Sequence, residues 1–170
     1  MDVEMAIKTA IEYENKVRDV YANAVKQAEN NIAKRVFQRL AEEEQGHVEY
    51  LEYRLSEWQN TGKISLEKLK TTIPNKNAIK DGVKKLEDNM RESDRFGEVQ
   101  MLTKALSVEI ETSNFYKEMV NQLEDEPQKM FQRFIEIENG HLAIVQAEID
   151  SVTGMGFWFD FQEFNLEAEG

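Results

Sequence analysis

The chain has 170 residues, of which 41% are hydrophobic, and it contains no cysteine. This length and composition are typical of one globular domain with a proper core, and the lack of cysteine excludes disulfides, iron–sulfur clusters and cysteine-bound zinc. Asp and Glu number 33 against 21 Lys and Arg, which gives a formal net charge of −12. A chain this acidic is not expected to bind nucleic acid, although it can attract cations.

The start of the chain and its hydropathy bear on where the protein works. The first residues, Met1-Asp2-Val3-Glu4, include neither a basic start nor an apolar run, so we expect no secretory signal. No stretch approaches the roughly 20 apolar residues of a membrane span. We therefore expect a cytoplasmic protein that does not bind a membrane.

Long helices are favoured because only two prolines and eight glycines interrupt the chain. Asp2 can cap a first helix that runs to about residue 29. The two asparagines that follow can cap a second helix, which runs to about residue 60 before a stop at Gly62. In both helices apolar residues recur in alternating steps of three and four, as in the buried stripe of a bundle helix.

Residues 61–93 form a long connection after the first helix pair. Gly62, Pro74 and several lysines interrupt this stretch, and we expect a short helix over about residues 77–89. A connection of this length allows the third helix to begin at either end of a bundle.

The second helix pair follows the connection. Ser93 or Asp94 can cap a third helix that runs to about residue 123, and Asp125 can cap a fourth helix that ends near Gly154. Both helices again carry an apolar stripe with a period that is typical of a bundle. The sequence therefore predicts an all-α fold, a four-helix bundle with a long connection between the second and third helices.

Two stretches, 36–47 and 130–141, are almost copies of each other. Both read apolar-Phe-Gln-Arg and both end in Glu-x-Gly-His, at an offset of 141 − 47 = 94. In the first and third helices, an offset of 95 aligns Glu14 with Glu109. The chain therefore reads as an internal duplication of a helix pair. The expected organisation is a bundle over 1–154, with halves at about 1–60 and 94–154 and a linker at 61–93, followed by an aromatic C-terminal tail at 155–170.

Six polar residues occupy stripe positions where a bundle expects Leu or Ala: Glu14, Glu44, His47, Glu109, Glu138 and His141. Four carboxylates in a dry core cannot all stay ionised alone, because burying one uncompensated charge costs several kcal/mol. Either some of them take up protons or cations lie between them. Four carboxylates and two neutral imidazoles balance two divalent cations, and this oxygen-rich set favours iron or manganese over structural zinc.

This set is similar to the ligands of ferritin-like di-iron and di-manganese bundles, in which two helices give one Glu each and two give Glu-x-x-His. On that resemblance, Glu44 and Glu138 are expected to bridge two metal ions. The terminal ligands are then expected to be Glu14 and Glu109, with His47 and His141 binding one metal each.

Over residues 5–152 the chain resembles the rubrerythrin branch of the ferritin-like superfamily. The resemblance rests on Glu14, Glu109 and the two Glu-x-Gly-His motifs. The resemblance implies an antiparallel bundle, a homodimer, and two iron ions that react with peroxide or dioxygen. Two features depart from the family. This chain has no cysteines for a rubredoxin iron, so electrons must come from a separate donor protein, and Thr112 stands where rubrerythrins carry an additional glutamate.

Three functions stay open on these observations. The leading hypothesis is a di-iron oxidoreductase that acts on hydrogen peroxide or dioxygen. The alternative is an iron-binding, ferroxidase-type protein without catalytic peroxide turnover, which the missing cysteines and Thr112 favour. The third is a metal-free interaction module that uses the aromatic tail as a docking strip, although we expect that tail to pack against its own bundle or a twin subunit.

Other residues near the two motifs are given structural interpretations. Three acidic residues are expected to be surface charges or to attract cations: Glu42, Glu43 and Glu136. Two tyrosines are expected to be core residues rather than partners of the ligands: Tyr21 and Tyr116. Two glycines are expected to allow close helix approach rather than to leave a gap for a small ligand: Gly46 and Gly140.

Overall fold

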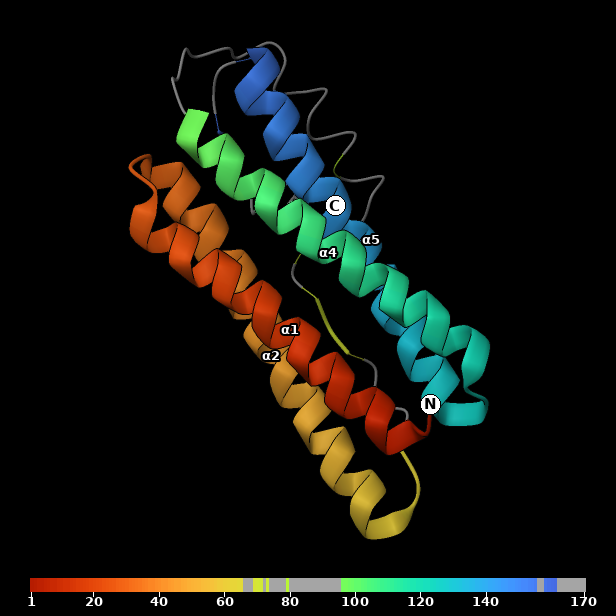
Figure 1. The fold of residues 1–170 in the computed structure, drawn as a ribbon. Coiled ribbons are helices and arrows are strands. Elements are labelled where there is room, and N and C mark those ends of the chain that lie inside the picture. Colours follow the sequence, from red (N-terminus) through yellow and green to blue (C-terminus); the bar gives the residue numbers. More distant parts are fainter. Residues whose placement is uncertain (66–68, 72, 74–78, 80–95, 156–157, 162–170) are drawn as a thin grey trace, which may run out of the picture.

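A computed structural model describes residues 1–65, 69–71, 73, 79, 96–155 and 158–161. Within these residues the chain is all-α, and Figure 1 shows the four long helices side by side. They are α1 (Val3–Gln27), α2 (Asn31–Thr61), α4 (Phe96–Gln122) and α5 (Asp125–Asp150), followed by a π-helical turn, η1 (Ser151–Met155). The predicted four-helix bundle is confirmed.

The helices form two antiparallel pairs, α1 with α2 and α4 with α5, and α1 also packs against α4 (Figure 1). Helices α2 and α4 run in the same direction, so the chain between them returns along the length of the bundle. The long connection predicted from the sequence is therefore what allows α4 to lie antiparallel to α1.

The ends of the first two helices follow the predicted capping chemistry. The Asp2 side chain accepts a hydrogen bond from Met5 N at 2.8 Å. The Asn30 side chain accepts hydrogen bonds from two backbone N–H groups at the start of α2. Helix α2 ends at Gly62, whose φ of 67° lies in the left-handed region that glycine enters without strain.

The second helix pair differs from the prediction in its details. The predicted caps of the third helix, Ser93 and Asp94, and almost all of the predicted helix at 77–89 lie outside the described residues. The expected stop near Gly154 falls inside the π-helical turn that continues α5. Val152 of this turn is buried. The predicted cap at Asp125 is wrong, because Glu124 is the N-cap and Asp125 is the first residue of α5.

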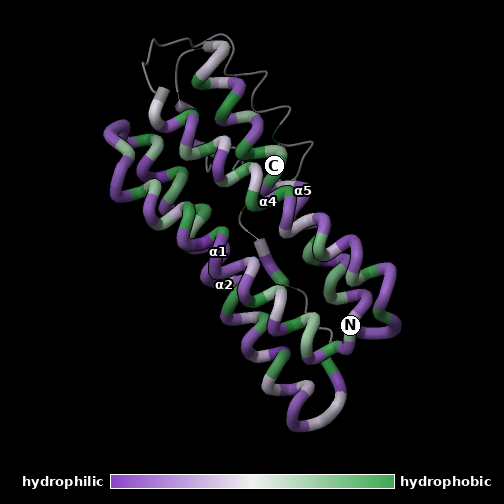
Figure 2. Tube along the Cα trace, in the orientation of Figure 1, coloured by the Kyte–Doolittle hydropathy of each residue, from purple (hydrophilic) through white to green (hydrophobic). Residues whose placement is uncertain are grey.

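Apolar residues recur along each helix between hydrophilic ones (Figure 2), and they form two separate buried clusters. One cluster includes Tyr21, Phe37 and Trp158, and the other includes Leu51, Tyr116 and Phe134. Because the clusters occupy different lengths of the same helices, the polar stripe residues lie between them.

The described part of the aromatic tail packs on its own bundle. Trp158, Phe159 and Phe161 are 2%, 3% and 0% exposed and belong to the first cluster. The ring centroids of Phe37 and Trp158 lie 5.3 Å apart in an edge-on arrangement. The tail residues that the structure describes therefore complete the core, as expected.

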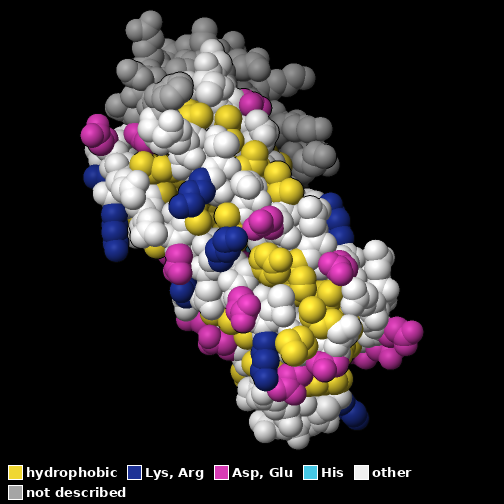
Figure 3. All heavy atoms as spheres, viewed as in Figure 1, with side chains coloured by type: hydrophobic (Ala, Val, Ile, Leu, Met, Phe, Trp, Pro, Cys, Tyr) yellow, Lys and Arg dark blue, Asp and Glu magenta, His cyan; other side chains and the backbone are white. Residues whose placement is uncertain are grey.

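The surface is mixed in character. On the face shown in Figure 3, apolar side chains lie scattered between charged ones, and no histidine is visible. None of the described helices is long and apolar enough to cross a membrane.

Glu148 of α5 is a buried carboxyl outside the six predicted ligands. Its side chain is 0% exposed, and Phe159 N of the tail donates to Glu148 Oε1 at 3.2 Å. Burial raises the pKa of Glu148 well above its usual range, and the negative charge of Asp160 acts in the same direction. Stability that depends on the protonated carboxyl is therefore present at low pH and is lost as the pH rises through the folded-state pKa.

We expect Glu148→Gln to increase the free energy of unfolding by about 1–2 kcal/mol near pH 8, because glutamine keeps an acceptor for Phe159 N and cannot ionise. The gain should vanish toward pH 4. Urea unfolding across this pH range measures it, and Glu52→Gln at an exposed position of α2 is the control. Equal stability of wild type and Glu148→Gln at every pH would contradict the prediction.

Candidate metal centre

The six predicted residues meet halfway along the bundle, between the two apolar clusters. Each is at most 1% exposed. Helices α1 and α4 supply one glutamate each, and α2 and α5 supply one Glu-x-x-His pair each, so the spacing of three places both members of a pair on the inner face. The buried residues are Glu14, Glu44, His47, Glu109, Glu138 and His141.

The potential ligand atoms of these six residues fall into two overlapping groups, and within each group they lie within 4.8 Å of one another; a third such group joins Glu43 to His47 and His141. Glu44 and Glu138 belong to both of the first two groups. One group is completed by Glu14 and His47, and the other by Glu109 and His141. Two neighbouring cations that share two bridging carboxylates require this arrangement.

Both imidazole rings turn Nδ1 toward the carboxylates. His47 Nδ1 lies 3.3 Å from Glu14 Oε2 and 3.3 Å from Glu44 Oε2. His141 Nδ1 lies 2.8 Å from Glu44 Oε1 and 3.6 Å from Glu109 Oε1. The two rings stack with centroids 5.3 Å apart and an angle of 15° between their planes. Each ring therefore presents the same nitrogen to its own ligand group.

Two buried tyrosines donate hydrogen bonds to Glu14 and Glu109, the two carboxylates that belong to only one of these two ligand groups each. Tyr21 of α1 donates from its hydroxyl to Glu109 Oε1 at 3.0 Å, and Tyr116 of α4 donates to Glu14 Oε1. Burial raises the pKa of both tyrosines, and the charges of Glu109 and Glu14 add to the effect, so both stay protonated donors. The expected core location is confirmed, and the less favoured alternative, that these tyrosines are partners of the candidate ligands, also holds.

The four carboxyl groups differ in the direction in which their pKa values are shifted. Burial raises the pKa of Glu44 and Glu138, and neighbouring carboxylates raise it further. Burial also acts to raise the pKa of Glu109, but contacts with Glu138 and His141 lower it to about 2. The pKa of Glu14 is likewise lowered against the effect of burial, chiefly by His47. The two shared carboxyls thus hold protons when no cation neutralises them.

The imidazoles show the complementary shift. Burial acts to lower the pKa of His47, but the charge of Glu14 raises it well above its usual range. Glu109 has the same effect on the pKa of His141. Protons therefore balance the charge of the cluster in the absence of cations.

The cluster passes a simple test of whether cations fit it. Among the described residues no group donates a hydrogen bond to Glu44 Oε2, Glu109 Oε2 or either carboxylate oxygen of Glu138. A buried acceptor without a donor costs about 1–3 kcal/mol. Divalent cations between the carboxylates would use these lone pairs, and the oxygen-rich donor set suits iron or manganese.

Thr112 follows Glu109 by one turn of α4. It is buried, and its hydroxyl donates to the Val108 carbonyl of the same helix at 2.8 Å. Helix α4 therefore contributes a single carboxylate, Glu109, to the cluster.

Glu43 is not a surface charge, whereas the alternative that it attracts cations stays a prediction. Its side chain is 7% exposed, and Oε2 lies 3.7 Å from His47 Nε2 and 3.8 Å from His141 Nε2. The repeat could have revealed this, because the offset of 94 aligns Glu43 with Ile137, which is also buried. Both other acidic residues are exposed as expected: Glu42 and Glu136.

The expected close helix approach at Gly46 is also wrong. A Cβ atom added there meets nothing within 4 Å. Gly46 instead lines a surface pocket of about 390 Å³ together with Glu43, His47 and Tyr50. The pocket therefore offers an opening that reaches one of the candidate ligands.

We expect Gly46→Ala to increase the free energy of unfolding by about 0.5–1 kcal/mol, because alanine favours the helix and the new methyl group meets no neighbour. Gly62→Ala is the matched comparison. It should lower the free energy of unfolding by about 1 kcal/mol, because Gly62 has a left-handed φ of 67°. Urea unfolding in the presence of a chelator measures both, and a loss of stability in Gly46→Ala contradicts the prediction.

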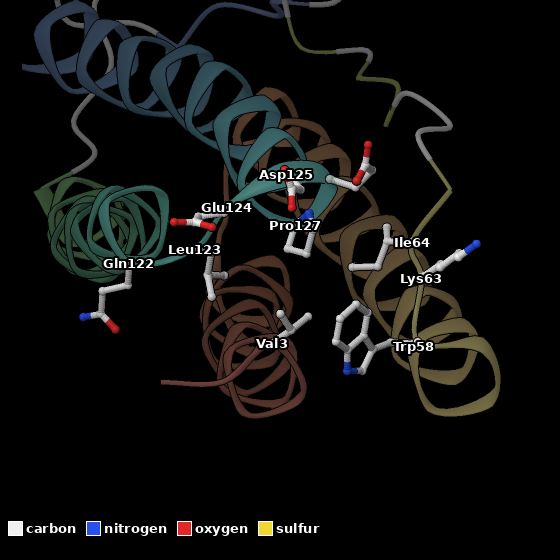
Figure 4. A pocket seen from close by; sticks show the side chains of 11 residues that line it. Val3, Trp58, Lys63, Ile64, Gln122, Leu123, Glu124, Asp125 and Pro127 are labelled. Carbon is white, nitrogen blue, oxygen red and sulfur yellow. The ribbon is translucent and has the colours of Figure 1, made fainter.

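A larger cavity of about 830 Å³ lies at the end of the bundle where α1 begins and α2 ends (Figure 4). Val3, Trp58 and Leu123 line it, with the acidic residues Glu124 and Asp125 at its edge. None of the six candidate ligands belongs to its lining, so it is separate from the candidate metal centre.

An antiparallel four-helix bundle with this buried cluster of carboxylates and imidazoles defines a ferritin-like protein with a candidate dinuclear metal centre. The sequence profile of the Rubrerythrin family matches residues 4–149, and the chain belongs to that family. Comparisons with curated proteins and with solved structures gave no significant match. The family resemblance inferred from the sequence is thus confirmed.

Proposed function

We propose that this protein is a di-iron oxidoreductase that reduces hydrogen peroxide or dioxygen with electrons from a separate donor protein. The observation that carries the proposal is the pair of ligand groups that share Glu44 and Glu138. Membership of the rubrerythrin family supports iron as the metal, and the same donors would also accept manganese. Iron bound there would supply one electron per ferrous ion to a small oxidant.

Each side chain has a defined role in this proposal. Glu44 and Glu138 would help to hold both metal ions, and the Nδ1 atoms of the two histidines would each hold one of them. Glu14 and Glu109 would each hold one ion, and the tyrosine hydroxyls already donate to one oxygen of each. The apolar clusters on both sides keep bulk water out, and the pocket beside Gly46 gives a small molecule a way in.

Anaerobic protein loaded with two ferrous ions per chain should be oxidised rapidly by peroxide, with two ions consumed per molecule of peroxide. Stopped-flow absorbance in the near ultraviolet measures this reaction. Protein loaded with zinc is the control, because zinc occupies similar donors and has no redox chemistry. No oxidation within seconds would remove the enzymatic proposal.

A second candidate function is iron binding with a single oxidation and no catalytic peroxide turnover. Thr112, which bonds only to its own helix among the described contacts, favours it, as does the absence of cysteine from these 170 residues. Repeated turnover with an added reductase and rubredoxin would exclude this candidate.

Two statements about partners also stay predictions: that a separate protein donates the electrons and that the chain forms a homodimer. Light scattering tests whether the protein is a dimer.

A further inference from the structure

The Nε2 atoms of both histidines face one side chain. Glu43 Oε2 lies 3.7 Å from His47 Nε2 and 3.8 Å from His141 Nε2. Within the described part of the chain, neither Nε2 atom has a hydrogen-bond partner, although both are buried. The rings are nearly parallel, so a single carboxylate meets the same edge of both imidazoles.

Metal binding defines what these Nε2 atoms need. A neutral imidazole that binds a metal through Nδ1 carries its proton on Nε2. A buried N–H group needs an acceptor, and a carboxylate is the acceptor that best orients a metal-bound imidazole and increases its basicity. The observed separations exceed the usual hydrogen-bond length of about 2.9 Å by less than 1 Å, so a small side-chain movement closes them.

We propose that Glu43 is a positioning residue that accepts hydrogen bonds from Nε2–H of both metal-bound histidines, His47 and His141. The inference rests on the proposed metal centre, because Glu43 acts through the two ligands. A carboxylate has enough lone pairs for two donors. Glu43 therefore fixes one tautomer in both rings and strengthens both as ligands.

The two halves of the chain are unequal at this position, which explains why one residue serves both histidines. Ile137, the counterpart of Glu43 in α5, is 2% exposed and has no acceptor in its side chain. The second half of the chain thus supplies no carboxylate equivalent to Glu43. His141 depends on α2 for its acceptor.

The connection between α2 and α4 helps to hold Glu43. Thr71 Oγ1 donates to Glu43 Oε2 at 3.0 Å. Arg133 of α5 donates from Nε to the Leu69 carbonyl at 3.0 Å, which ties the same segment to the bundle. Thr71, which lies outside the helices that carry the candidate ligands, therefore helps to orient Glu43.

The test uses the full chain loaded with zinc, which is diamagnetic and binds carboxylates and imidazoles. In ¹⁵N-labelled wild type we expect two Nε2–H signals that exchange slowly with water. Glu43→Gln should shift both signals upfield, and Glu43→Ala should lose them to exchange. Zinc affinity should fall about 10–100-fold in Glu43→Ala and less in Glu43→Gln.

Glu42→Gln is the matched control, because Glu42 is the exposed neighbour of Glu43 on the same helix. It should leave both signals and the affinity unchanged. If wild type binds two zinc ions and Glu43→Ala binds them equally well with unchanged signals, Glu43 has no positioning role. If wild type itself does not bind two ions, the metal centre fails and this inference fails with it. Glu43→Gln is nearly isosteric, so its signals decide the question even if Glu43→Ala folds poorly.

Discussion

A divalent cation in excess, at about 100 times its dissociation constant from each site, should raise the midpoint of thermal unfolding of the metal-free protein by about 10–20 °C. A ligand at 100 times its dissociation constant stabilises the native state by about 2.7 kcal/mol, so two sites give about 5 kcal/mol. In a chain of this size each kcal/mol shifts the midpoint by about 2–4 °C. The native core supplies the affinity, because four of its buried carboxylate oxygens accept no hydrogen bond from described residues: Glu44 Oε2, Glu109 Oε2 and both oxygens of Glu138.

The same loading should release up to four protons at about pH 6. Burial raises the pKa of Glu44 and Glu138, while the charges of Glu14 and Glu109 raise the pKa of His47 and His141 against burial. Two protons come from the carboxyls and two from the imidazolium rings, and bound cations replace them. Metal affinity must therefore decrease as the pH falls. Calorimetry in buffers of different ionisation enthalpy counts the protons released.

A chelator provides the control for the thermal prediction, because removal of the metal should return the midpoint to that of the metal-free protein. Ferrous, manganous and zinc ions should all raise the midpoint, since charge compensation does not depend on redox chemistry. A midpoint that is unchanged by all three ions would show that the buried cluster is a purely structural, protonated network.

Helical periodicity explains why the bundle and its polar core could be predicted from the sequence. The steps of three and four that define an inward stripe placed Glu14 and Glu109 on the same faces as their apolar neighbours, and both are 0% exposed. The Glu-x-x-His spacing did the same for the pairs on α2 and α5. Because burial of six such residues is costly without compensation, their stripe positions predicted that either protons or cations neutralise them.

Residues whose role depends on contacts between distant segments could not be predicted in the same way. Tyr21 donates to a carboxylate 88 positions away in the sequence, and periodicity predicts only that it is buried. Glu43 lies beside the ligand Glu44, but its orientation depends on Thr71, from a connection without a regular pattern. The opening at Gly46 likewise depends on the connection after α2. Two residues of that connection, Leu69 and Lys70, line the pocket together with Gly46.

The glutamates proposed to bridge two metals and those proposed to bind one metal should respond differently to replacement by glutamine. Glu14→Gln removes a ligand from one group only, so the group of Glu44, Glu109, Glu138 and His141 stays complete. This variant should retain one tightly bound cation per chain. Glu138 belongs to both groups, so Glu138→Gln should weaken both sites, by about tenfold or more. Dialysis followed by elemental analysis measures the stoichiometry of each variant.

Glu138→Gln should stabilise the metal-free protein and destabilise the metal-bound protein, each relative to wild type. Both of its carboxylate oxygens are buried without a hydrogen-bond donor among the described residues. In the metal-free protein, Glu138→Gln should increase the free energy of unfolding by about 1–2 kcal/mol. The neutral amide replaces a carboxyl group whose ionised form is destabilised by burial. In the presence of metal the same variant should be less stable than wild type, since the gain from binding is lost.

Glu109→Gln is the matched control for Glu14→Gln, because the two occupy equivalent positions in the two ligand groups. It should also leave one cation bound, now held by the group that contains His47. If Glu14→Gln or Glu109→Gln loses both cations, the sites are coupled through more than the shared carboxylates. If Glu138→Gln instead keeps one cation at wild-type affinity, Glu138 binds only one of the two cations in the metal-loaded protein and does not bridge them.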